Sequence, residues 1–298
     1  MLEYYIDVGS STIKVYRHAK KLKLINEYSI HFKDGFTAEQ GISQENKKDL
    51  YDYFVHLKSK YSFKYENTHI FATGIFRNID RAKRLELARE FNRRFDLNFT
   101  IISHDLENYY LGKAMEHDYG GKKVMIVNMG GKTTELVTFK TGQINNRQNL
   151  QIGVADLLNE FPGVNNKYSS VKIKTIVDFV KRRIAGVKFD QDYDCTIFTG
   201  GEERFEKLTK YNLVSNTIFD DKIHKYMLSF SDFVKGNEKI FYKMTIQDLY
   251  DLMPQNPKWM DGARAGAILP QAIFEKADVK TIVPSDLNLI NGVIKDIF

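Results

Sequence analysis

Two stretches of the chain share one pattern of apolar and polar positions. Residues 5–15 and 126–137 each read as an apolar strand, a turn of small and polar residues, and a second apolar strand. Apolar runs on either side of a short polar turn are typical of β-hairpins. Two such hairpins that face each other across a cleft would direct backbone N–H groups and hydroxyls at a phosphate chain from both sides. The pattern therefore predicts a site for phosphoryl transfer or phosphate hydrolysis.

The first half of the chain alternates between predicted strands and predicted helices. Residues 2–32 predict two or three antiparallel strands, with Asp7 at the mouth of the first turn. The elements expected after them are a helix over 44–61, a strand over 68–73, a helix over 81–94, a strand over 100–103 and a helix over 105–116. This alternation predicts an α/β domain.

The second half repeats this order of elements. A polar break at residues 118–123 is the best candidate for a domain boundary, and the second hairpin begins directly after it. The later elements expected are helices over 154–161 and 169–184, a strand over 195–198, a helix-rich stretch over 207–253, a helix over 263–274, a strand over 280–283 and a final helix over 287–298. We expect one domain over residues 1–122 and another over 123–284, with residues 285–298 returning to pack on the first.

The composition indicates a globular protein with two domains. At 298 residues, of which 43% are hydrophobic, the chain is long enough for two domains with cores of their own. No run of eighteen apolar residues occurs, and the first residues lack the basic and apolar regions of a signal peptide. We therefore expect a cytoplasmic protein that makes no contact with membranes.

Charge and cysteine content narrow the classes of ligand. The net charge of +6 favours polyanionic ligands, but charge alone does not separate polyphosphate, nucleotide and nucleic acid. No nucleic-acid-binding motif accompanies the charge, so no specific nucleic-acid partner is expected. The single cysteine, Cys195, excludes an internal disulfide and a metal cluster held by several thiolates. Its apolar neighbours indicate a buried strand.

A duplicated domain with phosphate-binding hairpins resembles the actin, sugar kinase and Hsp70 ATPase superfamily. Within it, the segment Phe71-Ala-Thr-Gly-Ile-Phe-Arg-Asn resembles the Ala-Thr-Ser-Ala-x-Arg element of the exopolyphosphatase and guanosine pentaphosphate phosphatase (Ppx/GppA) family. Further segments that resemble this family are residues 102–108, 149–153, 261–268 and 283–292. The likeness runs in order from residue 5 to residue 298. It implies an α/β fold of two ribonuclease H-like (actin-like ATPase) domains flanking a cleft.

The resemblance implies a hydrolase that releases terminal phosphate from inorganic polyphosphate or pppGpp, and a homodimer is usual for the family. By the same resemblance, Glu107 is the water-activating glutamate and Glu135 binds cation or water. The groups that it implies for phosphate binding are Asp7, Gly9, Ser10, Ser11, Arg77, Gly130, Gly131, Lys132, Thr133, Gly200 and Gly201. Among these, Arg77 is suited to bidentate contact with phosphate oxygens.

Three positions depart from the family pattern. Asn128 stands where the family has a magnesium-binding aspartate, Leu106 replaces an acid beside Glu107, and Lys132 replaces the third glycine of the second hairpin. A neutral amide is a poorer ligand for Mg²⁺ than a carboxylate, so the resemblance implies a weakened magnesium site at Asn128 and Glu135. Either Lys132 takes over part of the role of the cation, or hydrolysis has been lost.

Two alternatives to hydrolysis stay open. A non-catalytic sensor of polyphosphate or guanosine polyphosphates is favoured by Asn128 and Leu106. An ATP-dependent kinase or ATPase of the same superfamily fits the first hairpin, although a sugar kinase gives no reason for the elements that carry Arg77 and Glu107. The cysteine content excludes an activator of the dehydratase type, which needs clustered cysteines. Phosphate release from polyphosphate and pppGpp, with and without magnesium, separates these alternatives.

Overall fold

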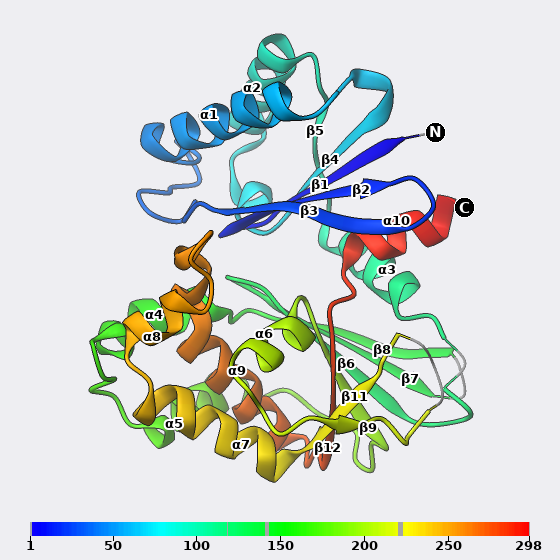
Figure 1. Ribbon diagram of the computed structural model, residues 1–298, viewed down its shortest axis with the longest axis vertical. Coiled ribbons are helices and arrows are strands. Elements are labelled where there is room, and N and C mark those ends of the chain that lie inside the picture. The colour runs from blue at the N-terminus through cyan, green and yellow to red at the C-terminus, as the bar shows by residue number, and fades with distance from the viewer. Residues whose placement is uncertain (1, 118, 141–142, 220–222, 298) are drawn as a thin grey trace. The chain divides into compact units, whose positions relative to one another are not determined.

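The protein, described here by a computed structural model, consists of two compact units. The described residues are 2–117, 119–140, 143–219 and 223–297. Unit 1 is Met1–Glu107 and unit 2 is Asn108–Phe298 (Figure 1). Asp118, in the polar break expected between the domains, lies outside the described residues, and the boundary expected after residue 122 stays a prediction. Among the described helices, none combines the length and the apolar composition needed to cross a bilayer.

Unit 1 is built on a five-stranded sheet with the order β3-β2-β1-β4-β5. Its elements are β1 (Glu3–Val8), β2 (Thr12–His18), β3 (Leu22–Ser29), α1 (Gln44–Lys60), the short turn η1 (Tyr65–Asn67), β4 (Thr68–Ala72), the short turn η2 (Gly74–Asn78), α2 (Arg81–Phe95), β5 (Phe99–Ile101) and the start of α3 (His104–Ala114). β1, β4 and β5 are parallel neighbours, whereas β2 and β3 extend the sheet antiparallel. The alternation expected for the first half of the chain is confirmed.

Packing between the sheet and two helices forms the core of unit 1. Ile6 and Val8 of β1 are fully buried, as are Phe54 of α1 and Phe91 of α2. The rings of Phe54 and Phe91 meet edge to face with their centroids 4.7 Å apart, which is a favoured arrangement for aromatic pairs. This core holds β1 and β4, and the predicted site residues of unit 1 other than Glu107 lie at or just after the carboxyl ends of these strands.

Unit 2 is built on a seven-stranded sheet with the order β10-β11-β12-β9-β6-β7-β8. Its elements are the rest of α3, β6 (Val124–Met129), β7 (Thr134–Lys140), β8 (Gln143–Leu150), α4 (Val154–Glu160), η3 (Pro162–Asn165), α5 (Ile173–Arg183), β9 (Cys195–Thr199), α6 (Glu202–Leu208), β10 (Val214–Ser215), β11 (Tyr226–Ser229), α7 (Phe230–Glu238), η4 (Lys239–Lys243), α8 (Ile246–Asp251), η5 (Pro257–Gly262), α9 (Ala263–Lys276), β12 (Thr281–Ser285) and α10 (Leu289–Ile297). Cys195 is buried at the start of β9, as expected.

The two units repeat one topology. The strands β8-β7-β6-β9-β12 of unit 2 have the order and the directions of β3-β2-β1-β4-β5 in unit 1. The two hairpin turns are also equivalent. The Gly9 N–H donates to the Thr12 carbonyl at 2.9 Å, and the Gly130 N–H donates to the Thr133 carbonyl at 2.8 Å. The repeat of elements expected from the sequence is therefore confirmed, and it extends to the geometry of the turns.

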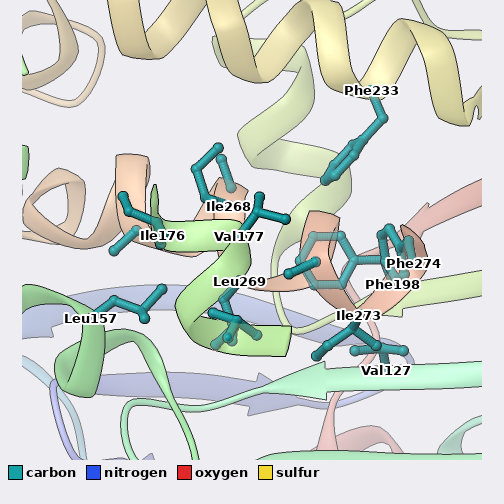
Figure 2. Packing of buried hydrophobic residues seen from close by; sticks show 14 of the residues in the cluster. Val127, Leu157, Ile176, Val177, Phe198, Phe233, Ile268, Leu269, Ile273 and Phe274 are labelled. Atoms are coloured by element: carbon teal, nitrogen blue, oxygen red, sulfur yellow. The ribbon is translucent and has the colours of Figure 1, made fainter. Parts of the chain in front are cut away.

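Both faces of the unit 2 sheet are covered. On one face, Val127 and Phe198 pack with Phe274 of α9, in the cluster that Figure 2 shows. On the other face, Ile126 packs with Leu111 of α3. Burial on both faces explains why β6 reads as a continuous apolar run in the sequence, with no alternation between apolar and polar residues.

Strand β8 was not expected from the sequence. Its residues are mostly polar, and Gln143, Asn146 and Arg147 are exposed. It lies at the edge of the sheet, and among the described strands it pairs with β7 alone. Edge strands often carry polar residues, so they lack the apolar pattern that marks a strand. The stretch over 207–253, expected to be rich in helices, likewise contains the short strands β10 and β11 besides α7 and α8.

The final helix packs against α3. A side chain at Gly292 of α10 would lie only 1.7 Å from the Tyr110 carbonyl oxygen, so the close approach of the two helices requires glycine there. The Tyr109 hydroxyl donates a hydrogen bond of 2.6 Å to Asp296. Both contacts lie within unit 2. The expected return of the last helix to a domain over 1–122 stays a prediction, because α3 runs across the division between the units.

Candidate active site

The first hairpin turn is joined to the segment that carries Arg77. The buried Ser10 hydroxyl accepts a hydrogen bond of 2.9 Å from the Ile75 N–H, at the start of η2. Gly74 has φ +58, and a Cβ at this position would lie 2.2 Å from the Ser10 Oγ. Only glycine fits both the backbone conformation and the space. The predicted phosphate-binding turn and the predicted phosphate-binding arginine therefore belong to one local structure.

Arg77 and Glu107 form a largely buried ion pair within unit 1. The Arg77 Nη1 donates to the Glu107 Oε2, and the two side chains are 8% and 12% exposed. Arg77 follows β4, and Glu107 lies on α3, which follows β5. The carboxyl ends of parallel strands are the usual place for ligand sites in α/β sheets. Both residues thus lie where the fold favours a site, and each already contacts the other.

Of the buried polar atoms of unit 1 that have no hydrogen-bond partner among the described residues, three lie at or close to the predicted site. These atoms are Asp7 Oδ1, Arg77 Nε and His104 Nδ1, and all three are buried. Burial raises the pKa of Asp7 to about 7, against the opposing charge of Lys14 and with a smaller contribution from Glu107. Burial also lowers the pKa of His104, and the Arg77 charge adds to this effect. Buried polar groups are rarely left unpaired, so these atoms indicate a place where water or a ligand binds.

A row of polar side chains crosses the unit 2 sheet. The strand pairing aligns Ser285 with Thr199, Thr199 with Asn128, Asn128 with Glu135, and Glu135 with Asn149. Residues directly opposite one another on neighbouring strands share a face. The row lies at the carboxyl ends of the parallel strands β6, β9 and β12. We call these five residues the polar row.

Glu135 is the buried carboxylate of the polar row, and it is 2% exposed. One of its oxygens accepts a hydrogen bond of 2.9 Å from the Asn128 Nδ2, and the other accepts one of 2.6 Å from the Thr133 hydroxyl. A buried carboxylate needs such donors, because burial without them is costly. Neutral groups from the neighbouring strand and from the hairpin turn therefore stabilise Glu135.

The second hairpin turn is attached to the start of α4. The N–H groups of Val154 and Ala155 donate to the carbonyls of Gly130 and Gly131 at 3.1 and 3.0 Å. A Cβ at Gly153 would lie 2.4 Å from the Lys132 nitrogen, so the turn rests directly on this glycine. These first N–H groups of α4 are therefore used by the turn and do not serve a phosphate.

Lys132 is paired within unit 2. Its Nζ lies 2.7 Å from Asp156 Oδ1, and the second Asp156 oxygen accepts a hydrogen bond of 2.9 Å from the Gly153 N–H. The lysine that replaces the third glycine thus reaches back to the first turn of α4. Contact between Lys132 and phosphate, expected from the sequence, stays a prediction.

The remaining predicted residues lie beside the two hairpin turns and the ion pair described above. Gly200 and Gly201 follow β9 with φ +121 each, and a Cβ at Gly200 would lie 3.2 Å from the Asn128 Oδ1. The Ser11 carbonyl accepts a hydrogen bond from the Ile30 N–H, which ties the first turn to β3. Leu106, at the position of the missing acid, is 37% exposed.

The structure places the predicted residues in two groups. Asp7, Gly9, Ser10, Ser11, Arg77 and Glu107 lie in unit 1, whereas Asn128, Gly130, Gly131, Lys132, Thr133, Glu135, Gly200 and Gly201 lie in unit 2. Sequence reasoning missed Asp156 as the partner of Lys132, and it missed Thr199 and Ser285 as members of the polar row. Thr199 and Ser285 could have been identified only from the pairing register of the strands, which a single sequence does not provide.

The unit 2 residues expected to bind magnesium give it a poor fit. Mg²⁺ prefers oxygen ligands, chiefly carboxylates and waters, in octahedral geometry. Both Glu135 oxygens already accept hydrogen bonds, and Asn128 turns its nitrogen toward Glu135. The weakened magnesium site stays a prediction, and we assign no step of the reaction to the ion.

Comparisons with known proteins agree with this architecture. The model of the Ppx/GppA phosphatase family matches residues 15–298. None of the curated proteins matches the chain. The structure of the Ppx/GppA family member from Aquifex aeolicus is similar with a TM-score of 0.70 at 19% identity, over 99% of this chain and 97% of that one. An exopolyphosphatase from Cytophaga hutchinsonii is similar with a TM-score of 0.73 at 13% identity, over 100% of this chain and 97% of that one. The expected fold class of two actin-like domains is confirmed.

Proposed function

Because the chain belongs to the Ppx/GppA phosphatase family, we propose that it hydrolyses phosphoanhydride bonds and releases the terminal phosphate of inorganic polyphosphate or pppGpp. The observation that carries the proposal is the largely buried ion pair of Arg77 and Glu107. Hydrolysis of a phosphoanhydride needs a cationic donor for the phosphate oxygens and a carboxylate for the attacking water. The ion pair brings these two groups into contact.

Arg77 is the bridge between ligand and base in this proposal. One guanidinium nitrogen donates to Glu107, while the Nε has no partner among the described residues. A guanidinium has five N–H donors in a planar fork and can serve two anions at once. A phosphate oxygen on the Nε side would leave the contact with Glu107 intact. The terminal phosphate would then lie next to the carboxylate that orients its water.

Glu107 is the proposed general base. It accepts a proton from the water that attacks the terminal phosphorus, and such a group contributes typically about 10²- to 10⁴-fold to a rate. The bond to the bridging oxygen breaks, and that oxygen leaves on the shortened chain. Each turn, over Gly9–Ser11 in unit 1 and over Gly130–Thr133 in unit 2, is proposed to bind phosphate through its backbone N–H groups and hydroxyls, as turns of this kind do for anions.

The test is phosphate release from polyphosphate and from pppGpp, each with and without magnesium. We expect release from at least one substrate, and we expect it to persist when magnesium is chelated. An absence of release from both substrates under both conditions contradicts the proposal. ATP is included because faster release from ATP than from either substrate would favour the ATPase alternative.

A sensor of the same ligands is the second candidate function. The hydrogen bond from Asn128 to Glu135 favours it, because an amide holds the carboxylate without any cation. Such a site keeps its shape and its anion-binding turns even if hydrolysis is lost. Binding of tripolyphosphate without phosphate release, in both the wild type and Asn128→Asp, would support the sensor. A cytoplasmic location and a homodimer remain predictions.

A further inference from the structure

We propose that Asn149 binds a phosphate oxygen of the ligand through its side-chain amide and that Asn108 orients it for this contact. The inference rests on the proposed function and adds a residue to the phosphate-binding groups proposed for unit 2. Asn149 lies directly opposite Glu135 in the strand pairing, at the β8 end of the polar row. It is partly exposed, whereas Glu135 is buried. The polar row thus ends in a side chain that a ligand can reach.

A hydrogen bond between the two asparagines fixes which end of the Asn149 amide faces outward. The Asn108 Nδ2 donates to the Asn149 Oδ1 at 3.0 Å. Because the oxygen is occupied by Asn108, the Asn149 Nδ2 points away from it with both of its N–H donors. Among the described residues, no hydrogen bond uses this nitrogen. Two outward amide donors opposite the strand that follows the second hairpin turn suit an anionic oxygen.

Asn108 is held rigidly enough to orient its partner. It is 5% exposed, and it lies one turn before Gly112 on α3. A Cβ at Gly112 would lie 3.0 Å from Ile144 and 3.5 Å from Arg147, so α3 lies close against β8 at this point. Residues four apart on a helix share a face, which places Asn108 on the side of α3 that faces β8.

The hydrogen-bonded pair of Asn108 and Asn149 also leaves one polar atom in an unfavourable environment. The Asn108 Oδ1 is buried without a hydrogen-bond partner among the described residues. A buried unpaired amide oxygen destabilises a fold, so an apolar pair would serve packing alone at least as well. The loss of stability from this unpaired oxygen is explained if the Asn108–Asn149 hydrogen bond has a role beyond packing. Orientation of the Asn149 donors is such a role.

The alternative is that the Asn149 side chain only contacts water at the edge of the sheet and binds no ligand. The substitution Asn149→Asp separates the two roles. An aspartate at this position still accepts the hydrogen bond from Asn108, so this contact is preserved, and thermal unfolding of the variant checks that the carboxylate opposite Glu135 leaves the protein folded. It offers no donors, however, and it adds a negative charge where the ligand is anionic.

The experiment measures tripolyphosphate affinity by calorimetry and, where the wild type hydrolyses polyphosphate, KM and kcat. We expect Asn149→Asp to weaken affinity by about tenfold or more and to raise KM similarly, with kcat changed by less than about threefold. Asn149→Ser, which keeps one donor, should lose less than Asn149→Ala. Asn146→Asp is the matched control, because it adds the same charge at an exposed position of the same strand. Its affinity should stay within about twofold of the wild type.

Affinity within about twofold of the wild type for both Asn149→Asp and Asn149→Ala overturns the inference. An equal loss in Asn146→Asp also overturns it, because the effect would then be one of net charge. These outcomes are distinct from failure of the proposed function. If the wild type releases no phosphate, hydrolysis is contradicted, but the affinity measurements still decide whether Asn149 binds the ligand.

Discussion

The Asn128 Nδ2 donates a hydrogen bond of 2.9 Å to the Glu135 carboxylate, across neighbouring strands. An aspartate at position 128 would bring a second carboxylate to the same place. Two carboxylates in contact need a cation or a shared proton between them. The amide removes this need, because it carries its own donor. Asn128 thus stabilises Glu135 in the way that a bound cation would in a dicarboxylate site.

We therefore expect Asn128→Asp to make the protein dependent on magnesium. Without magnesium, the lost hydrogen bond and the new repulsion should destabilise it by about 2–4 kcal/mol. Magnesium should restore the stability and stimulate phosphate release. Thermal unfolding and phosphate release, each measured over a magnesium titration, check this. Asn146→Asp controls for added charge, and equal magnesium responses of Asn128→Asp and the wild type would contradict the prediction.

The ion pair between Lys132 and Asp156 can be removed by substituting either residue. Lys132→Gly should weaken tripolyphosphate affinity by about threefold to tenfold if the ammonium serves the ligand as a point charge. Asp156→Asn keeps an acceptor for the Gly153 N–H but releases Lys132, so it should strengthen affinity. Both side chains are partly exposed, and stability should change by no more than about 1 kcal/mol. Unchanged affinity in both variants would leave Lys132 with a structural role only.

Asp7 should make ligand binding depend on pH near neutrality. Its pKa of about 7 means that the carboxyl is neutral and able to donate below this pH, and negatively charged above it. Tripolyphosphate affinity should therefore fall as the pH rises through about 7. In Asp7→Asn this part of the pH dependence should disappear, and calorimetry at several pH values compares the two proteins. A wild-type and a variant profile of the same shape would exclude Asp7 from the site.

The same pKa has a consequence for stability. Because the pKa of folded Asp7 lies above the ordinary value of 3.8, the folded state holds this proton more tightly than the unfolded state does. The contribution of Asp7 to stability is therefore complete below 3.8 and is lost as the pH rises to about 7.

Glu206 should destabilise the protein at neutral pH. It is 1% exposed, and neither carboxylate oxygen has a hydrogen-bond partner among the described residues. Burial raises its pKa well above the ordinary value, and the charges of Glu202 and Asp286 add to the effect. The folded state thus favours the protonated form, and its stability falls as the pH rises above the unfolded pKa.

The substitution Glu206→Met should raise the free energy of unfolding at neutral pH by about 1–3 kcal/mol, because it removes an unpaired buried polar group. The gain over the wild type should grow with pH. Chemical denaturation across a pH series measures it. Glu238→Gln, at an exposed glutamate of α7, is the control and should show no such trend. A gain that is independent of pH would mean that the Glu206 charge plays no part.

The sequence predicts the parts of this protein that local patterns determine. The two hairpins share the spacing from Gly9 to Thr12 and from Gly130 to Thr133, and the turns are equivalent in the structure. The strand β8 escaped prediction because an exposed edge strand lacks apolar periodicity. Contacts between segments that are distant in the sequence were not predicted either. The Arg77–Glu107 pair depends on the order of parallel strands, which local pattern does not specify.

The most direct test of the account is turnover by Glu107→Gln with polyphosphate and pppGpp. The amide keeps the shape of the side chain and can still contact Arg77, but it cannot accept the proton of the attacking water. We predict that turnover falls by about two orders of magnitude or more, while tripolyphosphate affinity stays within about threefold. Asp105→Asn, which removes an exposed carboxylate two residues away, should leave turnover unchanged. Wild-type turnover in Glu107→Gln would contradict the central claim that this carboxylate activates the water.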